Sequence, residues 1–327
     1  MNRPILAIIG AGQIGRRHLQ ALKRLNRSAR LFVVDPNPSS LTLAKKQYKE
    51  TPKTHVKHDI YYLNDLGDLP DNIDVAIIAT TSDVRKTIVL HLLETSHVDC
   101  MILEKVVFQD EESFVEINDR LQSEGVMCWV NCPLRTLETF EKAKEELRTS
   151  TPVHYRLVGS DWNLASNAIH HLDLFSYLTD ERVVDLSQSR LNNAIQLSKR
   201  KGFYEVTGTL EGLGENGSTF KVTSQDKSGN PFILHVSNSD VHLVLNFTQQ
   251  EGWVAHKKTN WLWKPFPCDI VLQSNLTHLY VEDILNFNRC KLPTYQESWQ
   301  QHLPLLKVLS AKFKKAGLTS GKECPIS

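Results

Sequence analysis

The chain opens with a short apolar run that breaks into three glycines, and this segment constrains the fold most strongly. Residues 4–9 are typical of a buried strand, and Gly10, Gly12 and Gly15 follow with the spacing G-x-G-x-x-G. We expect Gly10 to permit a tight turn, Gly12 to let a pyrophosphate approach the backbone, and Gly15 to let the next helix pack closely. The helix amides expected to face the phosphates include those of Gln13 and Ile14.

A second apolar run, residues 31–34, ends in Asp35, 20 residues beyond Gly15. A carboxylate at this place accepts hydrogen bonds from an adenosine ribose and would repel a 2′-phosphate. The alternative is a glycine-rich turn followed by a solvated aspartate. Because strand, turn, helix, strand and acid occur in this order, we predict a dinucleotide site with NAD as the cofactor.

Composition excludes several other classes of protein. The 327 residues include 38 basic and 37 acidic side chains, a formal charge of +1, so we expect no nucleic-acid partner. No apolar run reaches membrane-spanning length, and the first one breaks at Gly10, before a signal-peptide core could form. The six cysteines are sparse, and Cys128 and Cys132 lack a matching second pair. We therefore expect reduced thiols, no metal site and a cytoplasmic protein.

Residues 1–133 alternate strand and helix patterns. Strands are expected at 73–79, 100–104 and 127–131, with helices at 39–49 and 111–123 among them. This order is typical of an α/β Rossmann domain, a doubly wound parallel sheet with its ligand sites at the carboxyl ends of the strands. The first domain, 1–133, is predicted to bind NAD.

The pattern changes in the remainder of the chain, residues 134–327. Polar and apolar residues alternate over five segments, which predicts an α+β domain with a predominantly antiparallel open sheet. We expect this domain to bind substrate and to mediate a homodimer or homotetramer, since an open sheet face can be buried against a partner. Helices are expected at 167–178 and at about 297–316, and the second could pack back on the first domain. The alternating segments are 153–158, 204–210, 219–224, 232–237 and 241–247.

Glu104 and Lys105 end the fourth expected strand of the first domain. A lysine at the carboxyl edge of a sheet, partly desolvated beside a nicotinamide, could have a lowered pKa and exchange a proton with a substrate oxygen. The alternative is an ordinary surface lysine after a strand, and the local sequence does not separate the two.

The chain resembles the Gfo/Idh/MocA oxidoreductases, the family of glucose–fructose oxidoreductase and inositol dehydrogenase, over nearly its whole length. Residues 10–19, GAGQIGRRHL, resemble the family opening, Ala79-Thr80-Thr81 its Ala-Thr-Pro turn, and residues 103–106 its Glu-Lys-Pro signature. The resemblance implies that Thr80, Thr81, Glu104 and Lys105 contact the cofactor and that Lys105 gives or takes the proton. Asn131 and Arg135 resemble residues that follow the last Rossmann strand.

A second family signature places an aspartate four residues before a histidine and another three after it. Here these positions are Ser166, His170 and Asp173, and spacings of three and four residues share one helix face, together with Asn167. The resemblance implies proton transfer or positioning by His170. The alternative for His170 is a packed histidine at the domain boundary. Substrate contacts are expected from Ser166, Asn167, Asp173, Arg135 and Trp162, the last in a polar loop before this helix.

Two positions depart from the family pattern. Val106 stands where the family has proline, which removes a fixed φ beside Lys105. Ser166 stands where the family has an acid that would raise the pKa of His170, and Asp161 could supply a substitute carboxylate. Trp162 and the later tryptophans have an alternative role in the core, since aromatic residues in sheets are usually buried.

The resemblance implies a NAD(H)-dependent oxidoreductase that moves hydride between nicotinamide and a CH–OH/C=O group of a sugar, cyclitol or nucleotide-activated sugar. Lys105 would be the general acid/base and His170 its partner. Two alternatives stay open from the sequence: a NAD(H)-binding sensor or regulator that has lost the chemistry, which the serine at 166 favours, and reduction of an imine or a tetrapyrrole.

Overall fold

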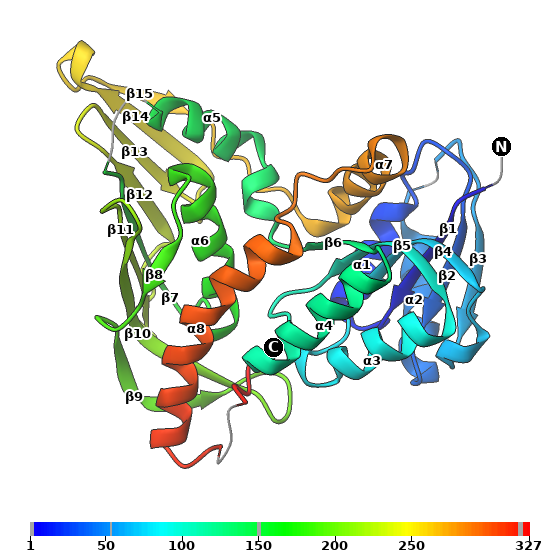
Figure 1. Cartoon of the computed structure of the whole chain (residues 1–327). Helices are drawn as coiled ribbons and strands as arrows, with labels where there is room; N and C mark the ends of the chain where they lie inside the picture. The colour runs from blue at the N-terminus through cyan, green and yellow to red at the C-terminus, as the bar shows by residue number, and fades with distance from the viewer. Residues whose placement is uncertain (1–2, 53, 149–151, 320–322) are drawn as a thin grey trace. The chain divides into compact units, whose positions relative to one another are not determined.

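The computed structural model of the chain describes residues 3–52, 54–148, 152–319 and 323–327. Contacts group the chain into two compact units (Figure 1). The first unit runs to Pro133 and includes a later segment, Val271–Gln296, whereas the second comprises Leu134–Ile270 and Glu297–Ser327. The return of residues 271–296 to the first unit was not indicated by any sequence pattern.

Among the described residues, the first unit contains a six-stranded parallel sheet in the order β3-β2-β1-β4-β5-β6. This is the doubly wound sheet that the sequence predicts, and its central strands are almost wholly buried. Strand β3 was not predicted; among the described strands it is a half-exposed edge strand that pairs only with β2. The strands are β1 (Ile5–Ile9), β2 (Arg30–Val34), β3 (Asp59–Leu63), β4 (Asn72–Ile78), β5 (His97–Leu103) and β6 (Met127–Val130).

Helices pack around this sheet in two groups. Helix α1 packs against α2 and against α7, which comes from the returning segment, while α3 packs against α4. Thr294 of the same segment forms a bridge with Trp129 at the edge strand β6. The helices of the first unit are α1 (Gln13–Leu22), α2 (Pro38–Glu50), α3 (Ser82–Thr95), α4 (Glu111–Ser123) and α7 (Thr277–Phe287).

The second unit is built on a sheet of nine described strands, mostly antiparallel. Its one parallel pair among the described strands, β7 with β11, makes the sheet mixed. The predicted open antiparallel sheet is thus confirmed, with short strands that the alternation pattern did not indicate. The strands are β7 (His154–Ser160), β8 (Val183–Asp185), β9 (Arg190–Leu197), β10 (Tyr204–Gly214), β11 (Thr219–Gln225), β12 (Ile233–Ser237), β13 (Val241–Asn246), β14 (Glu251–His256) and β15 (Trp263–Phe266).

Helices α5 (Glu138–Leu147) and α6 (Leu164–Thr179) lie on one face of this sheet (Figure 1). Residues on strand positions facing the helices, such as Tyr155 and Phe220, are fully buried. The chain closes with α8 (Tyr295–Lys315), whose residues from Glu297 onward belong to the second unit, where Phe313 packs against Tyr204. The packing of this helix on the first domain stays a prediction.

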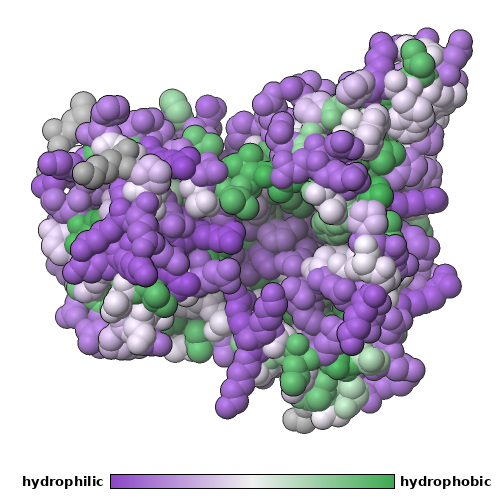
Figure 2. All heavy atoms as spheres, turned by 180° about the vertical axis from the view of Figure 1, so that it is seen from behind, coloured by the Kyte–Doolittle hydropathy of each residue, from purple (hydrophilic) through white to green (hydrophobic). Residues whose placement is uncertain are grey.

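Hydrophilic side chains cover most of the face seen in Figure 2, with apolar residues in smaller groups between them. No helix among the described residues is long and apolar enough to cross a bilayer.

Burial in the second unit should make its stability depend on pH. His171 is buried on α6, shares a 2.7 Å hydrogen bond with the Tyr155 hydroxyl, and has its pKa lowered to about 3 by burial. In the unfolded chain the His171 imidazole takes up a proton near pH 6.5, whereas the folded protein keeps it neutral. Its contribution to the free energy of unfolding is therefore fully present above pH 6.5 and is lost as the pH drops toward 3. We expect wild type to lose about 2 kcal/mol more than His171→Gln between pH 7.5 and pH 5.

Urea unfolding at the two pH values measures this difference, with His91→Gln on the exposed surface as the control. Equal losses in wild type and His171→Gln would show that His171 does not contribute to acid sensitivity.

Candidate active site

The glycine turn between β1 and α1 has the geometry that a dinucleotide requires. Gly10 has φ +98°, and a Cβ there would lie 2.9 Å from the backbone of Ala79 on β4's end. A Cβ on Gly15 would lie 1.8 Å from the carbonyl oxygen of Gly10. Both positions therefore exclude any side chain, since the turn and the helix touch the neighbouring backbone.

Gly12 differs from the other two glycines. No described atom lies within 4 Å of the place a Cβ would take, and its φ of −63° suits any residue. Folding alone does not require glycine at this position. The open space at the N-terminus of α1, where no described side chain caps the helix amides, fits a pyrophosphate.

Two polar groups at the ends of the next strands complete this part of the site. Asp35 Oδ2 accepts a 2.7 Å hydrogen bond from the Ala11 amide, which joins the end of β2 to the glycine turn. The buried Thr80 Oγ1, at the end of β4, has no hydrogen-bond partner among the described residues. An orphaned hydroxyl here fits the ribose contact that the family resemblance implies for Thr80.

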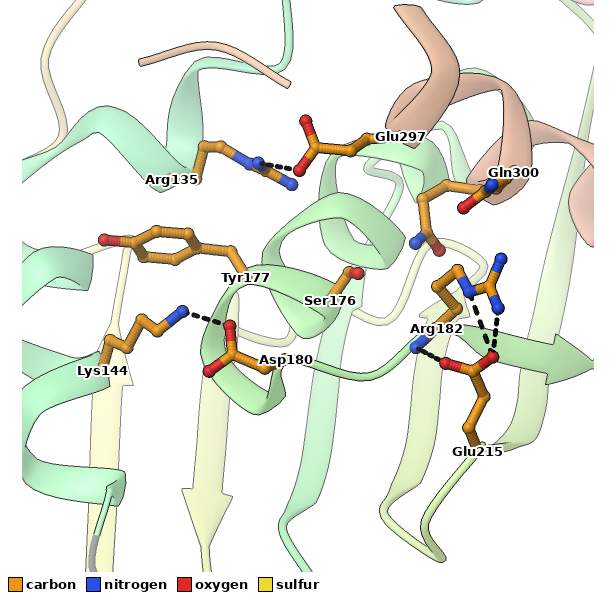
Figure 3. A pocket seen from close by; sticks show the side chains of 10 residues that line it. Arg135, Lys144, Ser176, Tyr177, Asp180, Arg182, Glu215, Glu297 and Gln300 are labelled. Atoms are coloured by element: carbon orange, nitrogen blue, oxygen red, sulfur yellow. Dashed lines mark hydrogen bonds and ion pairs between the residues drawn. The ribbon is translucent and has the colours of Figure 1, made fainter. Parts of the chain in front are cut away.

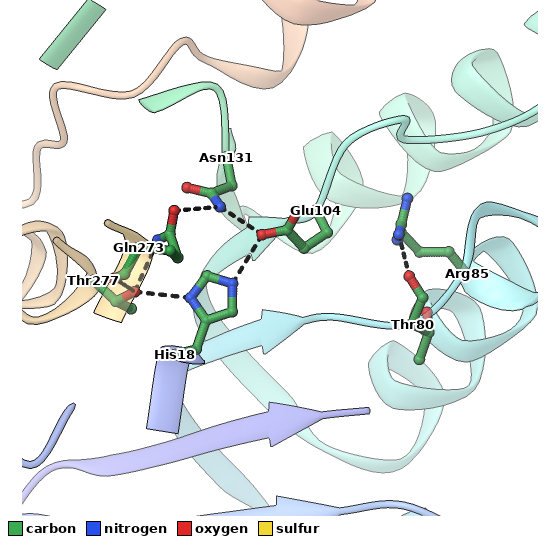
Figure 4. A network of polar contacts seen from close by, with 7 residues as sticks. All are labelled: His18, Thr80, Arg85, Glu104, Asn131, Gln273 and Thr277. Carbon is green, nitrogen blue, oxygen red and sulfur yellow. Dashed lines mark hydrogen bonds and ion pairs between the residues drawn. The ribbon is translucent and has the colours of Figure 1, made fainter. Parts of the chain in front are cut away.

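A buried carboxylate, Glu104, anchors the end of β5 (Figure 4). Nε2 of His18 lies 2.9 Å from Glu104 Oε1, and the Asn131 amide donates to the same oxygen. Burial alone would raise the pKa of Glu104, but the hydrogen bonds from His18 and Asn131 and the charge of Lys105 outweigh it and lower the pKa. Glu104 is thus held as a carboxylate directly before Lys105.

This network extends into the returning segment (Figure 4). Thr277 Oγ1 lies 2.8 Å from Nδ1 of His18, and Gln273 Oε1 accepts from Asn131 at 3.1 Å. Gln273 in turn donates to Thr277 Oγ1 at 2.9 Å. His18, Gln273 and Thr277 were not predicted to shape the site, since no local sequence pattern links positions so far apart in the chain.

Lys105 follows Glu104 and is half-buried, with a cis peptide bond to the fully buried Val106. Lys105 belongs to the first unit, whereas the predicted cluster of Ser166, His170 and Asp173 belongs to the second.

In the second unit, the structure supplies a carboxylate near Ser166 that was not predicted. Glu205 on β10 is buried and accepts from the Ser166 hydroxyl and, at 2.9 Å, from the Ala165 amide in the first turn of α6. The predicted substitute, Asp161, instead accepts from the Lys227 amide at 3.2 Å. Glu205 therefore takes the acidic place beside Ser166 and caps the helix that carries His170.

Two further predicted residues, Asn167 on α6 and Trp162 just before it, have hydrogen-bond partners. The Asn167 amide donates to the Trp162 carbonyl at 2.8 Å. The Trp162 indole N–H donates to the Thr223 carbonyl at 3.0 Å, and its ring packs edge-on against His171. These contacts fit the core alternative for Trp162, and its contact with substrate stays a prediction. His170 is half-buried on the same helix.

Arg135 and Asp173, both predicted to contact substrate, form a bidentate ion pair with distances of 2.9 and 2.7 Å. Burial raises the pKa of Asp173 to about 7, opposed by Arg135 and assisted by Glu297. Arg135 also lies over the Tyr177 ring and lines a polar cavity of about 340 Å³ (Figure 3). The pair occupies both oxygens of Asp173, so a substrate would meet Arg135 rather than a free carboxylate.

Comparisons with known proteins agree with this geometry. Residues 6–132 match the model of the Gfo/Idh/MocA oxidoreductase family with an NAD-binding Rossmann fold. These residues therefore belong to that family, and NAD is the cofactor of its Rossmann fold, as the sequence predicts. A search of curated proteins found no match.

Several solved structures share the fold of the whole chain. UDP-N-acetylglucosamine 3-dehydrogenase from Acidithiobacillus ferrooxidans is 14% identical, with a TM-score of 0.69 over 98% of this chain and 100% of that one. A levoglucosan dehydrogenase bound to NADH and levoglucosan is 16% identical, with a TM-score of 0.70 over 96% and 98%. The transcriptional regulator Gal80p from Kluyveromyces lactis is 14% identical, with a TM-score of 0.71 over 96% and 93%. At these identities the likeness concerns the fold.

The space at Gly12 generates a test of the cofactor site. Gly12→Val places a side chain where the pyrophosphate is expected, and no described atom lies within 4 Å of the position of its Cβ. We expect the variant to keep the thermal stability of wild type and to lose NADH affinity by at least about tenfold.

Fluorescence titration with NADH and thermal unfolding measure the two effects, with Gly67→Val in the exposed 3₁₀ turn before β4 as the control. Unchanged NADH affinity in a folded Gly12→Val protein would place the cofactor elsewhere.

Proposed function

We propose that the protein is a NAD(H)-dependent oxidoreductase acting on a CH–OH/C=O group of a sugar, cyclitol or nucleotide-activated sugar. The observation that carries this proposal is the placement of Lys105 directly after the anchored carboxylate of Glu104, at the carboxyl end of β5 in an NAD-binding Rossmann fold. NAD, when bound, accepts or supplies the hydride. Lys105 Nζ then takes the proton from the substrate hydroxyl during oxidation, or returns it during reduction.

His170 is assigned to orient or protonate the reacting oxygen. Its helix is fixed at the N-terminal turn by the Glu205 carboxylate, which limits movement of the His170 face. Ser166, Asn167 and Asp173 are assigned to the substrate side of the same helix, and Arg135, from the 3₁₀ turn before α5, is assigned to present its guanidinium to the substrate. Sugar dehydrogenases among the fold relatives, one solved with levoglucosan, support this substrate class.

A second candidate is a NAD(H)-binding regulator without turnover. The specific observation in its favour is that the acid of the family signature is absent at Ser166, and the carboxylate of Asp173 is bound by Arg135. Gal80p, a transcriptional regulator, is among the proteins that share the fold. The two candidates differ in one measurable property, namely hydride transfer.

We also propose a cytoplasmic homodimer or homotetramer. All six cysteines lie in described parts of the chain and carry free thiols, which suits a reducing compartment. The sheet face opposite α5 and α6 carries partly exposed apolar residues such as Val158 and Trp253, which suits burial against a second copy.

Replacing Lys105 tests the enzymatic proposal. Lys105→Met removes the proton donor while leaving the Rossmann turn intact, so NADH should still bind. On a substrate found by screening sugars and nucleotide sugars, single-turnover hydride transfer should fall by about 10²–10⁴. His170→Ala should lower the rate less than Lys105→Met does.

The control is Lys57→Met, which changes an exposed lysine of the same unit. If sugars stabilise the NADH complex but none in the panel is turned over, the regulator is the correct assignment. If Lys105→Met transfers hydride within a few-fold of wild type, Lys105 only contacts the cofactor.

The charge of Asp35 should set the preference for NADH over NADPH. Asp35→Asn removes the charge that repels a 2′-phosphate but keeps an acceptor for the Ala11 amide. We expect the NADH preference to shrink by roughly tenfold, measured by fluorescence titration of both cofactors. Tighter binding of NADPH than NADH by wild type would contradict this assignment.

A further inference from the structure

A buried arginine joins the two loops that the proposed function assigns to the nicotinamide ribose and to proton transfer. Arg85, on the first turn of α3, is 1% exposed. Its guanidinium donates to the Thr80 carbonyl after β4 (Figure 4). It also donates to the carbonyls of Val106 and, at 2.7 Å, Val107 after β5. One side chain thus holds three backbone oxygens from two loops.

These contacts lie immediately beside Lys105. On its N-terminal side, Glu104 is held by His18 and Asn131. On its C-terminal side, the peptide carbonyl of Val106 is held by Arg85, and Val106 itself is fully buried. Lys105 is therefore a half-buried residue between two anchored neighbours. Because its backbone is held on both sides, the position of its amine can change only by rotation within its own side chain.

Valine at position 106 leaves the backbone beside Lys105 without the restriction that a proline would impose. The family pattern has proline there, and proline restricts the backbone through its own ring. Valine lacks that covalent restriction, whereas a planar guanidinium offers five donors in a fixed geometry and remains charged at any working pH. Hydrogen bonds from Arg85 to the successive carbonyls of Val106 and Val107 can hold the same backbone segment in place of a proline ring.

We propose that Arg85 is a positioning residue that sets the place of the Lys105 amine and of the Thr80 turn, in the role that proline has in the family signature. The inference rests on the proposed function for the identity of the proton carrier. It goes beyond that function in assigning the geometry of this lysine to a residue of α3. Arg85 itself touches neither substrate nor cofactor in this assignment.

The test uses variants that differ in how many of the Arg85 hydrogen bonds to the Thr80, Val106 and Val107 carbonyls they can keep. Arg85→Lys keeps the charge but replaces the planar fork by a single ammonium, and Arg85→Gln removes the charge. The matched control is Arg120→Lys on α4, a partly exposed arginine paired with Glu124 at 3.3 Å. Thermal unfolding selects the variants that are folded.

The first readout needs no substrate. Lysines labelled by ¹³C-methylation give NMR signals, and the Lys105 signal is assigned by its loss in Lys105→Met. We expect Arg85→Lys to shift the titration midpoint of Lys105 or to split its signal, and to weaken NADH binding several-fold. Arg120→Lys should leave both unchanged.

The second readout is rescue. Because proline and Arg85 are assigned the same role, Val106→Pro in the Arg85→Gln background should restore the Lys105 signal toward that of wild type. On a substrate of the enzyme, Arg85→Gln should lower kcat by about 10²-fold with a smaller change in KM, and Val106→Pro should recover part of it.

The inference is wrong if folded Arg85→Lys and Arg85→Gln proteins keep the wild-type Lys105 titration and NADH affinity within twofold. If Arg85→Gln does not fold, Arg85→Lys decides the matter by the same two measurements. Failure of the proposed function has a different signature, because a protein without turnover would still show the dependence of the Lys105 signal on Arg85.

Discussion

The burial of one ionised carboxylate, Glu104, organises the first unit. A buried charge is costly unless hydrogen bonds satisfy it, and here His18 and Asn131 do so from α1 and from the end of β6. Asn131 and His18 are held in turn by Gln273 and Thr277. Satisfying Glu104 therefore ties together a helix, two strand ends and a segment from much later in the chain, and fixes the residue that precedes Lys105.

Local signals were sufficient to predict most of the Rossmann half, apart from the edge strand β3 and the returning segment. The glycine spacing and Asp35 lie within one strand–turn–helix–strand unit, and each has a steric or electrostatic reason that the sequence displays directly. The turn at Gly10 and Gly15 has the predicted close contacts, and the space at Gly12 is open as expected. Buried parallel strands are also continuous apolar runs, which makes them easy to recognise.

Residues whose roles depend on tertiary pairing could not be predicted in the same way. Ser166 and its partner Glu205 are 39 positions apart and meet only because β10 passes the start of α6. Asn131 and Gln273 are 142 positions apart. Arg85 was not singled out from the sequence, since nothing near it in the sequence shows that its acceptors are backbone carbonyls of another loop.

The returning segment has a consequence for biosynthesis. The ribosome delivers β1 to β6 first, but Gln273 and Thr277 emerge only after every described strand of the second sheet. Until then the nascent Rossmann unit holds His18 and Asn131 without these two partners. The cofactor-binding unit is thus begun first but completed only after the described strands of the second sheet have been made, which couples its maturation to synthesis of the second unit.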